Sequence, residues 1–214
     1  MKLIPILFIL IAAALGQSCS STTMLELSLN EDRRDSLEKA AVMHIRQLKQ
    51  GTLLVRLPAG STSVKALKSL TGQRGRIDAK EMAEINKRVI DIFHENYDFS
   101  SVLFFQSGRS RDFLSGNYEN LFLKRTLEPV DTPPVLSGPV YILDIDYVRL
   151  QGLERTVDGM QMMDGNFRIL SAPFPYFVKY NTPSLKSGEP AWRSFAETVQ
   201  KLDQNLTEFY SQQD

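Results

Sequence analysis

Two short, almost continuously apolar segments flank an amphipathic stretch in the first half of the chain. Residues 52–57 and 101–106 have the length of strands, and such apolar runs are typical of strands buried on both faces. Between them, Asp78 and Glu81 have the spacing of a helix capping box and open an apolar pattern of helical period that continues to Asn96. This order predicts two parallel strands joined by a right-handed crossover through a helix.

Three more regions have the periodicity of regular structure. Residues 31–50 carry an apolar stripe at helical spacing that includes His44, interpreted as a core or boundary residue, and Gly51 follows as a stop signal. Residues 140–148 predict a long strand. An Asp-Gly pair at residues 164–165, between two apolar runs, predicts a hairpin turn.

The C-terminal part is expected to complete the sheet and to cover it. Residues 173–180 contain two prolines, which cannot donate to a strand ladder, so this segment is expected at a sheet edge or extended on the surface. Residues 190–209 place apolar side chains on one helical face, which is expected to pack against the sheet. The predicted fold class is α/β: a single domain whose mixed sheet has a parallel strand-helix-strand core, an antiparallel C-terminal hairpin and flanking helices.

Residues 1–18 have the three parts of a secretory signal. A basic start at Lys2 is followed by the apolar run Leu3–Leu15 and then by small residues. The apolar run falls short of the roughly 20 residues that a membrane-spanning helix needs. We therefore expect a signal peptide at residues 1–18, a tether at 19–29 and one domain at 30–214.

Leu15, Gly16, Gln17, Ser18 and Cys19 resemble the lipobox of bacterial lipoproteins, and a serine directly before the cysteine is similar to the form common in the Bacteroidota. The resemblance implies that Cys19 carries a thioether-linked diacylglycerol and becomes the acylated N-terminus. Cys19 is the single cysteine of the chain, so no second thiol can pair with it within the chain. The strict lipobox has leucine three positions before the cysteine, whereas Leu15 stands four before. Cleavage after Gly16, or a cysteine that ends the signal by chance, is the alternative.

The charge balance indicates the kind of partner. Lysine plus arginine and aspartate plus glutamate each number 25, and loss of the signal would remove only Lys2. Without an excess of positive charge, we expect no nucleic-acid partner. The expected partner is the membrane, reached through the lipid anchor. The segment after Cys19 lacks the acidic block that resembles a surface-export signal, which favours a lipid-anchored envelope protein facing the periplasm.

The candidate pocket lies at the carboxyl ends of the predicted parallel strands, where ligands bind in open sheets. These ends lead into residues 58–61 and 106–111, and the second segment contributes Arg109. The basic loop at residues 72–76 could cradle a phosphate, but its spacing fits neither a P-loop nor a dinucleotide fingerprint, so a solvated turn is preferred. His94 lies beside the apolar stripe of the central helix and is a further candidate.

Asp144 and Asp146 follow an apolar strand and resemble, over three residues, the first motif of haloacid-dehalogenase-type phosphatases and the metal-binding pair of some glycosyltransferases. Asp146 is not followed by Gly-Thr, and no acidic pair with a suitable lysine occurs later in the chain. Residues two apart share a strand face, so polar positions on a half-exposed strand are the preferred interpretation. We expect no metal and no cofactor.

Two functions are compatible with these features. The first is a lipid-anchored bacterial cell-envelope protein with a non-catalytic binding or accessory role, similar in pattern to small lipoproteins of the Bacteroidota. Its partner would be an envelope protein or a glycan, because the aromatic residues of 173–180 could form a stacking platform, although core packing is the preferred interpretation. The alternative is a small envelope hydrolase that assembles its site at the strand ends from Arg109, Asp144, Asp146 and His94.

Overall fold

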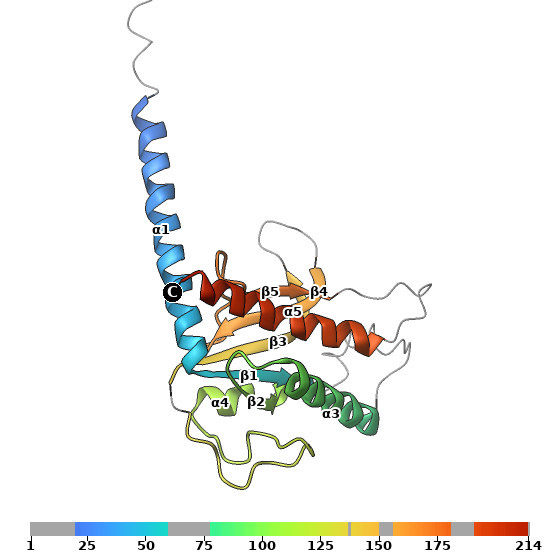
Figure 1. Ribbon diagram of the computed structural model, residues 1–214. Helices are drawn as coiled ribbons and strands as arrows, with labels where there is room; N and C mark the ends of the chain where they lie inside the picture. The colour runs from blue at the N-terminus through green and yellow to red at the C-terminus, as the bar shows by residue number, and fades with distance from the viewer. Residues whose placement is uncertain (1–19, 60–77, 137, 150–155, 181–190, 214) are drawn as a thin grey trace, which may run out of the picture. The chain divides into compact units, whose positions relative to one another are not determined.

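The structure is a computed structural model that describes residues 20–59, 78–136, 138–149, 156–180 and 191–213; for residues 20–30, 146–149, 156 and 191 it describes the backbone alone. In chain order the elements are α1 (Ser20–Gln50), β1 (Thr52–Leu57), α3 (Ala79–Asn96), β2 (Ser101–Gln106), the 3-10 turn η1 (Ser107–Arg109), α4 (Ser110–Leu114), β3 (Val140–Arg149), β4 (Thr156–Asp164), β5 (Phe177–Lys179) and α5 (Ala191–Ser211) (Figure 1). Residues 61–70, whose sequence favours a short helix, and the basic loop at 72–76 lie outside the described residues.

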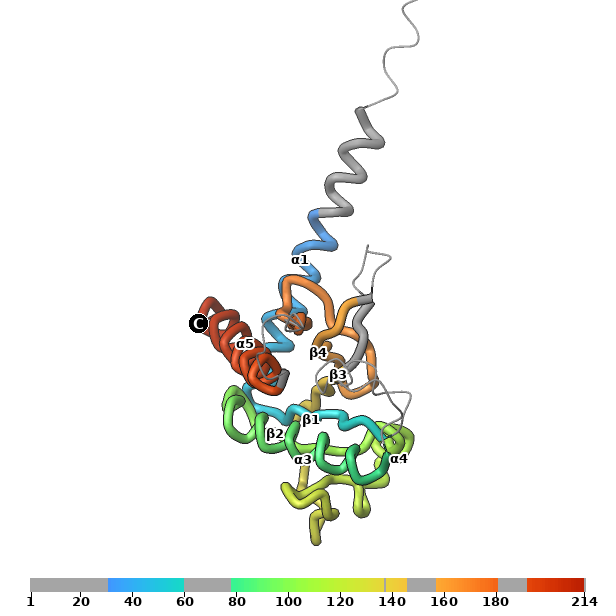
Figure 2. The backbone as a smooth tube through the Cα atoms, turned by 90° about the vertical axis from the view of Figure 1, so that its right-hand side faces the viewer, coloured from blue at the N-terminus to red at the C-terminus, as the bar shows by residue number. Residues whose placement is uncertain are grey.

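The strands that the structure describes form one mixed sheet in the order β2-β1-β3-β4-β5. β1 pairs in parallel with both β2 and β3, whereas β4 is antiparallel to β3 and β5 is antiparallel to β4. Figures 1 and 2 both place β1 between β2 and β3. The predicted α/β class, with its parallel strand-helix-strand core and its antiparallel C-terminal pairing, is confirmed.

β1 is the strand at which the order of the sheet reverses. The chain passes from β1 through α3 to β2 on one side of β1, and then through residues 107–139 to β3 on the other side. In an open α/β sheet such a reversal, at the carboxyl ends of the strands, is where ligands bind. At the other end of β1, Gly51 lets the chain before β3 approach closely, because a Cβ at this position would lie 2.1 Å from the Pro139 carbonyl oxygen.

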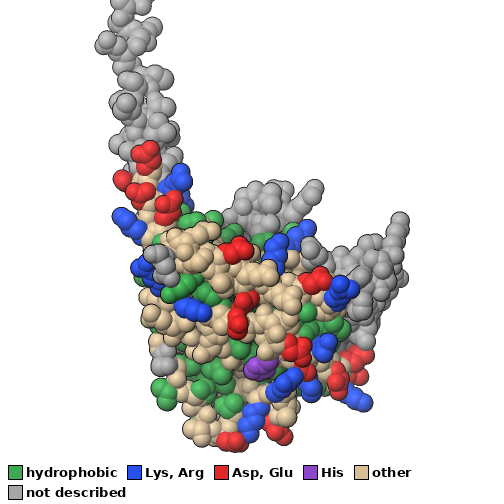
Figure 3. Space-filling model, in the orientation of Figure 1, with side chains coloured by type: hydrophobic (Ala, Val, Ile, Leu, Met, Phe, Trp, Pro, Cys, Tyr) green, Lys and Arg blue, Asp and Glu red, His purple; other side chains and the backbone are tan. Residues whose placement is uncertain are grey.

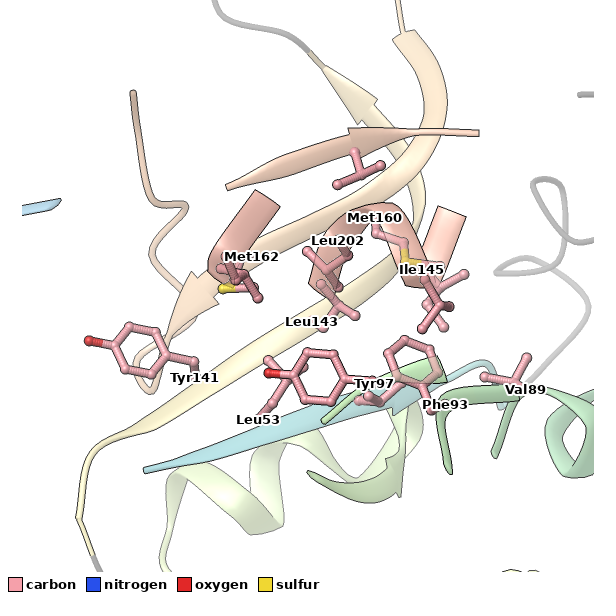
Figure 4. Close-up of a cluster of buried hydrophobic side chains, with 14 of the residues drawn as sticks. Leu53, Val89, Phe93, Tyr97, Tyr141, Leu143, Ile145, Met160, Met162 and Leu202 are labelled. Atoms are coloured by element: carbon pink, nitrogen blue, oxygen red, sulfur yellow. The ribbon is translucent and has the colours of Figure 1, made fainter. Parts of the chain in front are cut away.

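One face of the sheet carries the larger core. Side chains of β1, β3 and β4 pack there against α3, α5 and the last turns of α1. Asp78 and Glu81 form the predicted capping box, in which each side chain accepts the backbone N–H of the other residue and so fixes where α3 begins. Figure 4 shows part of this cluster, with Leu53, Val89, Phe93, Tyr97, Tyr141, Leu143, Ile145, Met160, Met162 and Leu202 labelled.

The other face is covered by α4 and by the chain that follows it rather than by a long helix. Leu54 and Ile142, from the two central strands, pack there with rings of Phe105, Phe113 and Phe122. Residues 121–124, whose apolar sequence favours a short strand, form only isolated bridges, one of which pairs Phe122 with Phe105 at the outer edge of β2. Both faces of β1 are therefore buried, as its apolar run predicts.

α1 begins earlier than expected. Its backbone is helical from Ser20, so the segment predicted as a tether is helical over its described residues and the expected start near residue 31 is wrong. Residues 20–30 contain neither glycine nor proline, so nothing in them interrupts a helix. The chain divides into two units, Met1–Ala40 and Ala41–Asp214, and every residue from 31 to 39 is exposed.

The turn at residues 164–165 lies where it was predicted, but the second strand of that hairpin does not form. Asp164 donates its N–H to the Arg168 carbonyl at 2.9 Å, and a single bridge follows between Met163 and Ile169. β4 pairs instead with β3 along one edge, and on its other edge β5 pairs with residues 159–161. β5 is the outermost strand, which confirms the edge position expected for residues 173–180.

Candidate functional site

A row of side chains crosses the second face of the sheet at the carboxyl end of β1. Arg56 on β1 pairs in register with Asp144 on β3, Asp144 with Gln161 on β4, and Gln161 with Phe177 on β5. Because residues in register share a sheet face, these four side chains stand side by side on the face opposite α3. All four are half-buried. We refer to Arg56, Asp144, Gln161 and Phe177 as the polar row.

Arg56 is held at three points. Its Nη1 donates to Asp144 Oδ2 at 2.8 Å, its Nε donates to Ser110 Oγ at 3.1 Å, and its guanidinium lies 5.8 Å from the centre of the Phe167 ring. The Arg56 and Asp144 side chains are each 28% exposed, so the ion pair is partly shielded from water but still accessible. Among the described residues the remaining guanidinium N–H groups have no protein partner, which leaves donors for a ligand.

The loops after β1 and β2 meet beside this ion pair. The backbone N–H of Ala59 donates to Ser107 Oγ at 3.1 Å, and Ser110 Oγ donates to the Ser107 carbonyl at 2.8 Å. The two segments expected to face each other at the strand ends therefore do so at their described residues; Gly60 and Ser61 lie outside them. The Ser110 hydroxyl thus donates one hydrogen bond to Ser107 and accepts another from Arg56. It therefore helps to orient the guanidinium.

The four predicted pocket residues have different locations. Asp144 joins the segment after β2, but through Arg56 and Ser110 rather than through Arg109. Arg109 instead binds its own loop, donating to Asp112 Oδ2 at 2.6 Å and to the carbonyls of Asn120 and Glu119 at 2.6 and 3.1 Å.

His94 and Asp146 do not complete the cluster. His94 is exposed on α3, with its ring 5.4 Å from that of Phe104, which packs in the core on the other face of the sheet. The structure therefore does not bring His94 to the ion pair. Asp146 lies opposite Gly159 in the β3–β4 register, and its side chain is outside the described part of the chain.

Arg56 and Gln161 are the residues that sequence reasoning missed. Arg56 is the single charged residue of an otherwise apolar strand, a departure that itself signals a partner, because a half-buried guanidinium needs one. Its partner stands 88 positions away in the chain. Gln161 lies in a strand of methionines, and among the described residues its side-chain amide has no protein hydrogen-bond partner.

A second polar cluster lies at the opposite end of β3. The Tyr141 hydroxyl donates to Gln47 Oε1 at 2.9 Å and lies 2.9 Å from His44 Nδ1, so His44 is the donor in that contact. Burial lowers the pKa of His44, partly opposed by the charge of Asp164, and burial with the same carboxylate raises the pKa of Tyr141 to about 12. Both groups are therefore neutral at pH 7. They join α1 to β3, as expected for a boundary histidine.

Several chemical features bear on what the domain can hold. Within the described residues, no three His, Cys, Asp or Glu side chains are close enough together to hold a metal ion. No helix in the described part of the chain has an apolar stretch long enough to cross a membrane. Figure 3 shows basic and acidic side chains intermixed on the face that it presents. Cys19, the expected lipidation site, lies outside the described residues.

The polar row places a guanidinium, a carboxylate and an amide side by side on a half-exposed sheet face, where they can form hydrogen bonds with a ligand.

No protein-family model, no curated protein and no solved structure matches this chain.

Proposed function

We propose that this chain is a lipid-anchored protein of the bacterial cell envelope, facing the periplasm, whose domain has a non-catalytic binding role. The anchor is supported by the signal-like residues 1–18 and by Cys19, the only thiol of the chain. Two acyl chains on that cysteine would hold the protein on a bilayer stably, whereas one chain binds only marginally.

The helix that follows the cysteine is compatible with an anchored chain. α1 is helical from Ser20, and the segment from there to Ala40 is about 30 Å long at 1.5 Å per residue. Its residues 31–39 are all exposed and mostly charged. Over residues 31–39 this is the pattern of a helix that crosses solvent between other parts of a structure, and Arg34 pairs with Glu38 one turn along it at 3.0 Å.

The observation that supports binding is the Arg56–Asp144 pair at the reversal of strand order. It places accessible, pre-oriented polar groups at the location where open α/β sheets bind ligands. Hydrolysis through a covalent intermediate would instead need a nucleophile beside a base. The hydroxyl nearest to the pair, on Ser110, accepts from Arg56 and donates to a carbonyl. This arrangement favours holding a molecule over cleaving it.

Metabolic labelling with an alkyne analogue of palmitate tests the anchor. The wild-type chain should be labelled and should fractionate with membranes, and Cys19→Ser should lose both properties. Ser20→Ala is the matched control, because it changes the neighbouring residue and keeps the thiol. Equal labelling of the wild type and Cys19→Ser would refute the anchor.

A further inference from the structure

We infer that the polar row binds an uncharged oligosaccharide, laid across β1, β3, β4 and β5 at their half-open face. This inference rests on the proposed binding role and names the class of ligand for it. It is drawn from the polar groups in the row, from the rings beside it and from its length.

The polar groups suit hydroxyls better than anions. The charge of Arg56 is already compensated by Asp144 at 2.8 Å, so the pair offers little net attraction to a carboxylate or phosphate. It does offer guanidinium donors, and Gln161 offers both a donor and an acceptor on one amide. A sugar hydroxyl can donate one hydrogen bond and accept another. Neighbouring hydroxyls on a sugar ring can therefore accept from the Arg56 guanidinium and both donate to and accept from the Gln161 amide.

Aromatic rings lie at both ends of the row. Phe167 lies under the guanidinium of Arg56 at one end. At the other end the ring of Phe177 lies over Gly159, where an added Cβ would come within 2.4 Å of its Cε2 atom. The missing side chain at Gly159 thus gives the ring its place on the sheet face. Both rings are half-buried, so each keeps surface on which the C–H face of a sugar can pack.

This arrangement refines the stacking platform expected from residues 173–180. Phe174 and Tyr180 are 2% and 1% exposed and belong to the core, as the preferred interpretation has it. Phe177 points to the opposite face of β5 from the buried Val178, and its ring leans over Gly159, two residues along β4 from its register partner Gln161. The platform therefore consists of the single Phe177 ring beside polar groups, and not of all four aromatic rings of residues 173–180.

The length of the row indicates more than one sugar unit. Neighbouring strands lie about 4.8 Å apart, so the three steps from Arg56 to Phe177 span about 14 Å. A single monosaccharide would contact only part of this distance. An extended chain of a few units would reach from Phe167 to Phe177.

The test is calorimetric titration of the full chain, purified in a polyoxyethylene detergent because maltoside detergents carry sugars themselves. The probes are maltohexaose, cellohexaose and chitohexaose, all uncharged, with acetate and inorganic phosphate as anionic probes. We expect at least one hexasaccharide to bind with a Kd in the millimolar range or tighter, and neither anion to compete with it.

Variants locate the binding. Gln161→Ala should weaken the hexasaccharide about fivefold or more, since it removes a donor and an acceptor at the centre of the row. Gln50→Ala is the matched control, an exposed glutamine at the end of α1 and at the opposite end of β1 from Arg56, and it should leave the affinity unchanged. Arg56→Lys keeps the charge opposite Asp144 but loses the planar fork, and it should also weaken binding. Circular dichroism melting confirms that each variant is folded.

Three results would overturn the inference: no hexasaccharide binding at millimolar concentration, binding that Gln161→Ala and Arg56→Lys leave intact, or binding of phosphate or acetate in place of the sugars. These failures are separate from failure of the anchor, because Cys19 labelling is measured in cells and does not depend on any sugar.

Discussion

Replacing Leu54 by alanine should remove a large part of the stability of the domain. Leu54 is fully buried in β1, with Leu103 of β2 and Ile142 of β3 in register on either side. Its side chain fills the smaller core, against the rings that α4 and the following chain lay over the sheet. The flanking strands are fixed by their own ladders, so the site cannot collapse around the missing atoms. We therefore expect Leu54→Ala to lower the free energy of unfolding by about 3 to 5 kcal/mol, the upper part of the range for leucine-to-alanine changes in protein cores.

The measurement is urea unfolding of the chain without residues 1–19, followed by circular dichroism, with the free energy of unfolding taken by linear extrapolation. The control is Leu114→Ala in α4, where the leucine is 57% exposed and the change should stay within about 0.5 kcal/mol. The midpoint of thermal unfolding should fall by roughly 6 to 20 °C for Leu54→Ala. A loss below about 0.5 kcal/mol at Leu54 would refute the burial of the second face of β1.

Two further results follow from the described charges. Burial opposes ionisation of Asp91, but hydrogen bonds from Arg125 and Lys87 outweigh it and hold the pKa of that carboxyl below its ordinary value. A carboxyl whose pKa is lower in the folded protein than in the unfolded chain stabilises the fold above about pH 4. The protein loses this stabilisation as the pH falls through the folded-state pKa. Asp91→Asn should therefore lower the free energy of unfolding at pH 7, and the gap to the wild type should narrow below about pH 4; a gap independent of pH would contradict the ion pairing. The double variant Asp144→Asn, Asp146→Asn should leave titrations with Mg²⁺ and Mn²⁺ unchanged, and loss of a site tighter than millimolar would support the metal motif instead.

The elements were predictable where one local signal was enough. The capping pair Asp78 and Glu81 and the stripe behind it place α3, and the apolar run of β1 predicts burial on both faces, because each depends on neighbours in the chain. The start of α1 was missed because Ser28 and Glu31 have the spacing of a capping box, which marks a place where a helix can begin but does not stop a helix that has already started. The strand predicted after residue 165 does not form, because β5, which is more distant in the chain, pairs with residues 159–161 on the edge of β4 that it needed.

The candidate site was predictable only in its location. The rule that ligands meet the carboxyl ends of parallel strands pointed to the segments after β1 and β2, and Asp144 was singled out separately by its Asp-x-Asp motif. The rule did not distinguish Arg109 from Arg56, because that choice depends on which side of β1 receives β3, a fact of pairing across 88 positions. Gln161 and Phe177 depend in turn on two antiparallel registers.

The place of β1 between β2 and β3 has a consequence for the order in which this chain can fold. β3 and β4 are near neighbours in sequence, with Arg149 opposite Thr156, so their pairing closes a short loop and can form early. β1 must wait for a partner at Val140, beyond the whole of α3 and β2. A chain that emerges from its N-terminus first would therefore hold β1 with one edge unpaired until β3 arrives. Folding should be slow for a domain of this size, with the closing of the parallel pair as its late step.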